Sequence, residues 1–418
     1  MKWSKRGVVI VVLGLVIAAC GGAATGSSPT TVPATASTDA NADTNTTRAP
    51  DASKSGSELL PEQEIPDLLR HLTTVWETDF SRATVDLNEI LVGIPALDPR
   101  DLIRPIDDPV FRPVAETTWL TDQDPGLALE IDGDARFYPL AVLTRHEIAN
   151  DEVGGIPVAV TYCPLCNTGI VFDRRFEGQI LRLGVSGLLR NSDLVMWDDD
   201  TTSLWQQITG QGIVGTYAGE QLQTIGSAIV RWADFAVAYP DGQAMSGDQG
   251  FGIRYGTNPY TGYSSRPTPY PFFRGELDDR YPALERVVGV TLDEASKAYP
   301  FSEIEKVQVV NDIVADQPVV VFWGASDTAD ALDSSRISES QGIGTGIAYS
   351  PVVGGQTLTF EVIGDIEFRD IETGTTWSIL GKALEGELAG EALELLPHRN
   401  EFWFAWHAFF PDADVWQG

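Results

Sequence analysis

The sequence repeats itself, and this repeat constrains the fold more than any other feature. Residues 131–139 match residues 292–300 at an offset of 161. Trp205 matches Trp377 at an offset of 172, because the second copy carries a Gly/Ser/Asp-rich insertion around 329–355. Further matches follow in the same order: Asn150 with Asn311, Gly219 with Gly390, Trp232 with Trp403, and Pro240 with Pro411. Such a collinear series predicts two homologous halves, 126–245 and 286–418, packed as an internal pseudo-repeat.

Strand signals dominate within each half. Runs of β-branched and aromatic residues at 158–162 and 319–323 are bounded by proline and turn residues, which is typical of short strands. Helix signals are fewer, and short helices are expected at 139–148, 300–307 and 59–72. The sequence therefore predicts an α+β, β-rich fold, in which a segment at 59–125 precedes the first half.

A long connector, 246–285, joins the two halves and is rich in Tyr, Pro and Gly. It contains Tyr255, Tyr260, Tyr263, Tyr270 and Tyr281. Two interpretations remain open. The connector is either a loop laid across both halves or a binding loop, since long structureless connections in compact domains are often functional.

The N-terminus predicts an exported protein. Three basic residues, Lys2, Lys5 and Arg6, precede the apolar run 7–19. This run is too short to cross a bilayer core of about 30 Å and fits a signal peptide at 1–19. It ends in Ala18-Ala19-Cys20, which resembles a bacterial lipoprotein signal, although an ordinary signal peptide with an incidental cysteine is the alternative.

A membrane anchor and a flexible tether are the expected consequence. Lipidation of Cys20 would hold the mature protein stably on the cell membrane. Residues 20–58 are dominated by small and polar residues that cannot bury enough apolar surface to fold, so they predict a disordered tether. We therefore expect an extracytoplasmic, lipid-anchored protein whose membrane contact is made through Cys20.

The charge balance excludes one class of partner. The chain has 28 Lys+Arg against 60 Asp+Glu, a formal charge of -32. Removal of the three basic residues of the signal peptide would leave 25 − 60 = −35. Because neutralising phosphates requires clustered Lys and Arg, we expect no nucleic-acid partner. The acidic run 198–200 could bind calcium, but an acidic β-turn is the favoured interpretation.

One motif carries chemistry. Cys163-Pro164-Leu165-Cys166 follows directly on the predicted strand 158–162. Two thiols at this spacing can bind one metal, form a disulfide or act as a redox pair. A thioredoxin-like pair needs a helix after the motif, whereas residues 167–172 predict a turn and a strand. The turn resembles a metal-binding knuckle, in which Asn167 tolerates a positive φ.

A metal at this pair would need further ligands. The chain has only three cysteines and four histidines. His146 lies upstream of the pair and Met196 downstream, and with Cys163 and Cys166 they would form a soft set that favours copper over zinc. A hydrogen-bonded structural histidine and a core methionine are the alternatives for these two residues. The second half lacks this ligand set. At the offset of 161, the positions of Cys163, Cys166 and His146 are occupied by Gly324, Asp327 and Val307.

Two functions stay open from the residues alone. The first is an anchored protein with a soft-metal or thiol-redox site at the cysteine pair. The second is a non-enzymatic binding or scaffold lipoprotein, in which the cysteines form a structural disulfide and aromatic residues contact a partner. Nothing in the sequence decides whether the protein is an enzyme.

Several sequence blocks resemble an uncharacterised prokaryotic family, DUF3179. They are Thr161-Tyr162-Cys163-Pro164-Leu165-Cys166-Asn167-Thr168-Gly169, residues 185–193, His146-Glu147-Ile148, Asn150-Asp151, residues 105–109, Asn258-Pro259-Tyr260 and residues 403–406. The resemblance covers most of the chain after about residue 75. One departure is Asn167, where the family pattern favours glycine. The resemblance implies a shared domain but no established activity and no metal.

Overall fold

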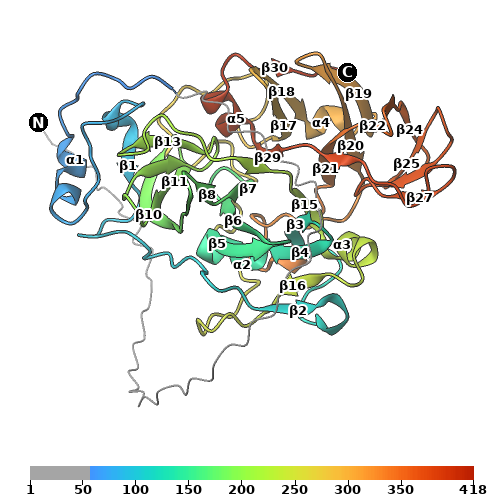
Figure 1. Ribbon diagram of the computed structural model, residues 1–418, viewed down its shortest axis with the longest axis horizontal. Coiled ribbons are helices and arrows are strands. Elements are labelled where there is room, and N and C mark those ends of the chain that lie inside the picture. Colours follow the sequence, from blue (N-terminus) through green and yellow to red (C-terminus); the bar gives the residue numbers. More distant parts are fainter. Residues whose placement is uncertain (1–56) are drawn as a thin grey trace, which may run out of the picture. The chain divides into compact units, whose positions relative to one another are not determined.

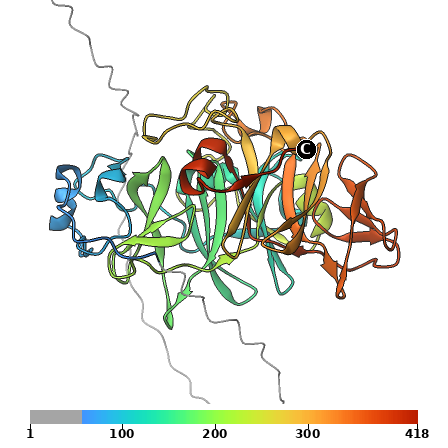
Figure 2. The same cartoon turned by 90° about the horizontal axis from the view of Figure 1, so that it is seen from above.

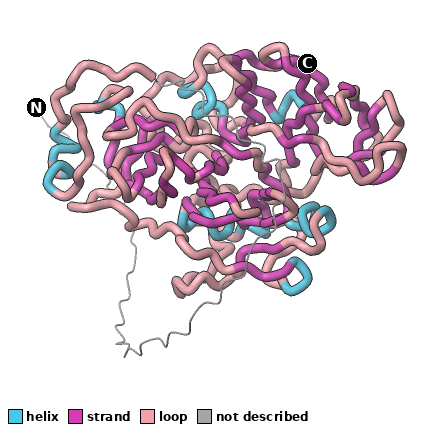
Figure 3. Tube along the Cα trace, in the orientation of Figure 1, coloured by secondary structure: helices cyan, strands magenta, loops and turns pink. Residues whose placement is uncertain are grey.

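Residues 57–418 are described by the computed structural model, and they form a β-rich α+β structure (Figures 1 and 3). The coarse fold class is thus confirmed. The predicted signal peptide 1–19, Cys20 and all but the last residues of the tether 20–58 lie outside the described residues. Among the helices of residues 57–418, none is long and apolar enough to cross a membrane.

The strands of the first half form three sheets and a small hairpin, and two of these sheets also include a strand from the segment 59–125. The central sheet has the order β14 (Thr224–Ile225), β7 (Thr168–Asp173), β6 (Ile156–Cys163), β5 (Ile148–Val153). A second sheet has the order β1 (Ile90–Val92), β10 (Leu183–Arg190), β11 (Asp193–Asp198), β12 (Leu204–Gln206), β13 (Gln211–Val214). A third has the order β15 (Ala228–Arg231), β3 (Pro125–Ile131), β4 (Asp134–Pro139), β16 (Gln243–Met245), β2 (Phe111–Pro113), and the hairpin is β8 (Arg175–Phe176) with β9 (Gln179–Ile180).

The second half also contains three sheets and a small hairpin. One sheet has the order β19 (Val309–Val314), β20 (Gln317–Gly324), β21 (Thr345–Ser350), β28 (Glu394–Leu395). Another has the order β24 (Phe360–Val362), β25 (Glu367–Asp370), β26 (Thr376–Ser378), β27 (Ala383–Glu385). The third has the order β29 (His398–Phe402), β17 (Arg286–Leu292), β18 (Ala295–Pro300), β30 (Asp414–Val415), and the hairpin is β22 (Val352–Val353) with β23 (Gln356–Thr357).

The helices are short. They are α1 (Asp67–Arg70), α2 (Leu140–His146), α3 (Trp232–Ala238), α4 (Phe301–Ile304) and α5 (Trp403–Phe409), with 3₁₀ turns at Leu72–Thr74, Leu87–Glu89, Val114–Glu116 and Ile337–Glu339. Helices α2 and α4 confirm two predictions. The predicted helix at 59–72 is wrong in extent, because helical structure begins only after Pro66, which lies in an extended conformation. Helices α3 and α5 were not predicted.

The two halves meet along several strand contacts. Strand β29 of the second half packs against β7 of the first, and β15 of the first half packs against β21 of the second. Green strands of the first half adjoin orange and red strands of the second in both ribbon views (Figures 1 and 2). An apolar cluster spans this contact, and it includes Phe172 from β7 and Phe402 from β29. The second half therefore lies beside the sheet that carries the cysteine motif.

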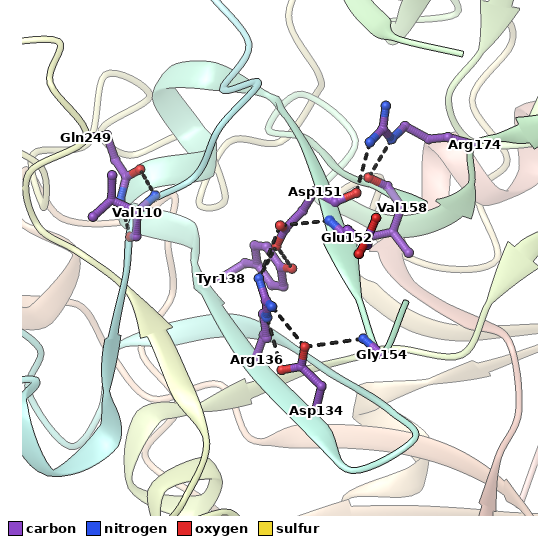
Figure 4. A network of polar contacts seen from close by, with 10 residues as sticks. All are labelled: Val110, Asp134, Arg136, Tyr138, Asp151, Glu152, Gly154, Val158, Arg174 and Gln249. Carbon is purple, nitrogen blue, oxygen red and sulfur yellow. Dashed lines mark hydrogen bonds and ion pairs between the residues drawn. The ribbon is translucent and has the colours of Figure 1, made fainter. Parts of the chain in front are cut away.

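A polar network holds the hairpins of the central region in register (Figure 4). Arg136 on β4 pairs with Asp134 at 2.8 Å and with Asp151 on β5 at 3.0 Å. The same Asp151 accepts a hydrogen bond of 2.6 Å from the hydroxyl of Tyr138. Arg174 donates to the backbone oxygens of Asp151 and Val158, which ties β5 to β6. These bonds fix the strand that ends at Cys163.

Candidate metal centre

The cysteine motif forms a tight turn between two buried strands. Cys163 is the last residue of β6, and β7 begins at Thr168. Asn167 has a φ of 56°, which confirms the predicted left-handed residue after the second cysteine. Its side-chain oxygen accepts a hydrogen bond of 3.2 Å from the hydroxyl of Tyr162. The turn therefore brings both cysteines to the same end of the sheet.

A carboxylate joins the two thiols. Asp193 is the first residue of β11 and follows a two-residue turn in which Asn191 and Ser192 both have a positive φ. One ligand atom from each of Cys163, Cys166 and Asp193 lies within 4.8 Å of the other two. Their side chains are buried, with exposed fractions of 2%, 0% and 0%. Both cysteines are free thiols rather than a disulfide.

The carboxylate of Asp193 is held at one oxygen only. Its Oδ2 accepts hydrogen bonds from the side-chain amide of Gln206 at 2.6 Å and from the backbone amide of Ile208 at 2.9 Å. Its Oδ1 is buried and has no hydrogen-bond partner within residues 57–418. A buried polar atom without a partner is uncommon in native proteins and often marks a site for a water or an ion. One oxygen thus orients the side chain, and the thiol of Cys163 lies close enough to the carboxylate to lower its pKa.

Two further buried carboxylates flank the group. Glu147 follows α2 with a φ of 60°, and burial together with the charge of Asp193 raises its pKa to about 8. Glu401 on β29 is fully buried, and burial raises its pKa to about 8. Both oxygens of Glu401 lack a hydrogen-bond partner within the described part of the chain. Across residues 57–418, neither glutamate forms an ion pair, nor does Asp193.

Burial also shapes the acid–base chemistry of the thiols and of Asp193. The pKa of Cys163 and that of Cys166 both lie above the ordinary value, because burial disfavours the thiolates. Burial raises the pKa of Asp193 to about 6. Without a cation, these groups are therefore harder to ionise than they would be in water. A bound metal ion would reverse this, since a cation stabilises the thiolates and carboxylates that ligate it.

His146 lies outside the group formed by the cysteines and Asp193. Its Nδ1 lies 2.6 Å from the carbonyl oxygen of Arg104, so Nδ1 carries the proton. Its Nε2 lies 2.9 Å from the hydroxyl of Tyr255 and accepts a hydrogen bond from it. Burial lowers the pKa of His146, consistent with a neutral ring. Both ring nitrogens are engaged, so this arrangement offers no free lone pair to a metal.

Met196 shares a core with the cysteines. It lies on β11, fully buried, in the apolar cluster that also contains Cys163 and Cys166. Its role as a ligand stays a prediction. The acidic run 198–200 forms a turn in which Asp198 accepts hydrogen bonds from the backbone and hydroxyl of Thr201, as the turn interpretation expects.

Sequence reasoning missed the three carboxylates. Asp193 and Glu147 both lie inside the sequence blocks that carry the family resemblance, so a signal for them was present. Glu401 had no comparable signal, because it reaches the site from the other half of the chain. Strand β29 places it there: the amide of Phe402 donates a hydrogen bond of 2.9 Å to the carbonyl oxygen of Cys166.

Comparisons with known proteins identify the domain and not its activity. No curated protein and no solved structure matches the chain. A family model described as "Protein of unknown function (DUF3179)" matches residues 93–413, which include the first half, the connector and all but the last residues of the second half. The chain therefore belongs to the DUF3179 family.

Proposed function

We propose that this protein binds a divalent metal ion between the thiolates of Cys163 and Cys166 and the carboxylate of Asp193. The observation that carries the proposal is the convergence of these three ligand atoms within 4.8 Å of one another in the buried interior. The free Oδ1 of Asp193 supports it. Glu147 is the candidate fourth ligand, because it is buried and its charge and those of Asp193 and Cys163 act on one another. Its oxygens do not lie within 4.8 Å of all three ligand atoms, so its side chain would have to move closer to bind the same ion.

Zinc fits this ligand set better than copper. Zn²⁺ accepts cysteine, histidine and carboxylate ligands together, usually in a tetrahedral arrangement. Cu(I) selects thiolates and thioethers, and a carboxylate is a harder ligand than it prefers. The expectation of copper assumed His146 and Met196 as ligands. Replacing them with Asp193 and Glu147 moves the preference to zinc.

A thiol-redox function is less well supported. Thiol–disulfide exchange requires an accessible thiolate, and reactive cysteines are partly exposed in electropositive surroundings. Cys163 and Cys166 are almost fully buried, and the charges around them are negative. The scaffold alternative with a structural disulfide is not favoured either, because both cysteines carry free thiols.

We also propose that the two halves are copies of one ancestral unit. Tyr138 donates to Asp151 at 2.6 Å in the first half, and Tyr299 donates to Asp312 at 2.9 Å in the second. Equivalent bonds join the indole of Trp205 to Asp198 and that of Trp377 to Asp370. Glu147 corresponds to Gln308 in the alignment of the two halves, and both residues have a φ of 60°. The positive φ at this position is therefore common to both halves. The carboxylate of Glu147 and the two cysteines occur only in the first half.

The proposed location follows from the N-terminal sequence. The basic, apolar and Ala-Ala-Cys order of residues 2–20 supports export and lipidation at Cys20. We propose that the metal-binding domain is held on the outer side of the cell membrane by this anchor.

Metal analysis of the full-length protein tests the proposed site. The protein is purified in detergent, under anaerobic conditions and without a metal-binding tag, and its zinc and copper contents are measured by mass spectrometry. We expect about one zinc per chain, lost in Cys163→Ser and held more weakly in Asp193→Asn. The matched control is Glu394→Gln, which changes an exposed carboxylate of β28 and should retain the metal.

Cobalt substitution identifies the ligands. Co²⁺ at this site should give the near-ultraviolet charge-transfer bands of cobalt–thiolate bonds, and they should weaken when either cysteine is replaced. A wild-type protein that takes up neither zinc, copper nor cobalt would refute the metal proposal. Copper bound in place of zinc would keep the site but refute the choice of metal.

A further inference from the structure

The connector passes directly over the cysteine turn. Tyr263 donates a hydrogen bond of 2.8 Å from its hydroxyl to the carbonyl oxygen of Leu165, the residue just before Cys166. The Tyr263 ring is fully buried and stacks on Tyr270 with centroids 4.3 Å apart and planes 3° apart. The connector therefore covers the loop that carries the thiols.

A second tyrosine of the connector packs on the core that contains the cysteines. Tyr260 packs against the apolar cluster that contains Cys163 and Cys166. Burial raises the pKa of Tyr260, and the charges of Glu147 and Cys163 raise it further. Glu147 is the most exposed of the proposed ligands, with an exposed fraction of 8%. Tyr260 and Tyr263 thus both pack on the core around the cysteine turn.

The end of helix α2 holds this part of the connector in place. The hydroxyl of Tyr255 donates to Nε2 of His146 at 2.9 Å, and the ring of Phe251 packs against the imidazole with centroids 4.6 Å apart. Arg145 donates to the backbone oxygen and the hydroxyl of Thr257. His146 immediately precedes Glu147, so this contact lies beside the site itself.

We propose that the connector, residues 246–285, is a movable cover over the metal site and that His146 is the positioning residue that holds it closed through Tyr255. The proposed ligands Cys163, Cys166 and Asp193 have almost no exposed surface, so an ion reaches them only when a covering segment moves away. The connector has no helix or strand between Met245 and Arg286, and such segments open locally at a lower free energy than sheet cores.

The identity of the bound metal ion rests on the proposed function, but the movement of the cover can be tested without metal. The metal-free full-length protein is incubated with an uncharged maleimide, and the labelling rates of Cys163 and Cys166 are followed by peptide mass spectrometry. Tyr255→Phe removes one hydroxyl that closes the cover. Because one hydrogen bond is worth about 0.5–1.5 kcal/mol, labelling should accelerate by roughly 2- to 10-fold. Tyr263→Phe should have a similar effect.

The control removes a hydroxyl from the same connector. Tyr270→Phe keeps the stacked ring, and within residues 57–418 the Tyr270 hydroxyl makes no hydrogen bond, so labelling should stay at the wild-type rate. Thermal unfolding of each variant separates local opening from global instability. Equal labelling rates in Tyr255→Phe and Tyr270→Phe would overturn the cover. The cover would also be overturned if the labelling rate depended on denaturant as steeply as global unfolding does. That result would mean that the thiols become accessible only when the whole protein unfolds.

Zinc exchange provides the second measurement. Release of zinc to an excess of chelator should accelerate in Tyr255→Phe by the same factor as labelling. If the wild-type protein binds no metal, the proposed function fails while the labelling result still decides the cover. If zinc binds but labelling and release are unchanged in Tyr255→Phe, the cover alone is refuted.

Discussion

The backbone amide of Phe402 donates a hydrogen bond of 2.9 Å to the carbonyl oxygen of Cys166. Through this bond, strand β29 of the second half touches the cysteine turn of the first. The neighbouring residue on the strand, Glu401, places a fully buried carboxylate close to Cys166 and Asp193. The candidate site is therefore built by residues that lie more than two hundred positions apart in the chain.

Replacing Glu401 with glutamine should stabilise the metal-free protein at high pH. Neither carboxylate oxygen has a hydrogen-bond partner among the described residues. The charge of Arg399 offsets part of the cost of ionising this buried group, but the pKa is still raised to about 8, so a net cost of about 1–3 kcal/mol remains at high pH. We expect Glu401→Gln to raise the free energy of unfolding by this amount at pH 9. At pH 5, where Glu401 is protonated, the difference should vanish. The exposed Glu394→Gln should change neither value.

The stability of the metal-free protein should fall as the pH rises from about 4.5 to 8. The pKa values of Glu147 and Glu401 are raised from 4.5 to about 8 in the folded protein. The folded state thus binds more protons than the unfolded state in this window, and its advantage is lost as the pH rises through 8. Thermal unfolding midpoints measured across the window check this. A midpoint that rises steadily up to pH 8 would contradict it.

Asp193→Asn should weaken zinc binding by at least about tenfold, a loss already typical when a group that supports a metal ligand is removed. The amide keeps the volume of the side chain and can still accept from Gln206 and Ile208, so the fold should persist. Competition with a zinc chelator of known affinity measures the change. Unaltered affinity would remove Asp193 from the ligand set.

Met196→Leu should leave the affinity for zinc unchanged. The swap nearly conserves apolar volume in a packed core, and such exchanges usually cost less than about 1.5 kcal/mol. The same competition assay decides the outcome. A clear loss of affinity without a loss of stability would restore Met196 as a sulfur ligand and would favour copper again.

Equivalent asparagines in the two halves should have equivalent structural roles. Asn150 exchanges two hydrogen bonds with the backbone of Leu183, and Asn311 does the same with Phe360. Asn150 is buried and Asn311 is exposed. We expect Asn150→Ala to destabilise the protein by about 2–3 kcal/mol and Asn311→Ala by about 1 kcal/mol. Unfolding in urea measures both. A larger effect at Asn311 would argue against this assignment of roles.

Local features of the site were accessible from the sequence. Strand periodicity placed β6 and β20, and the residue after Cys166 was expected to need a positive φ, which Asn167 has. These features are local. The alternation of side chains along a strand and the backbone preference of a turn residue both depend on a short stretch of sequence. The cysteine motif is of the same kind, because its spacing fixes that both thiols lie in one turn.

The composition of the site was decided by tertiary structure alone. His146 looked like a ligand because it lies near the cysteines in the chain, yet its nitrogens bind Arg104 and Tyr255. Asp193 and Glu401 reach the thiols because a hairpin turn and a packed strand bring them there. Sequence distance does not determine which side chains meet across sheets. That depends on how two halves pack, and packing is fixed only when all strands and their apolar faces are in place.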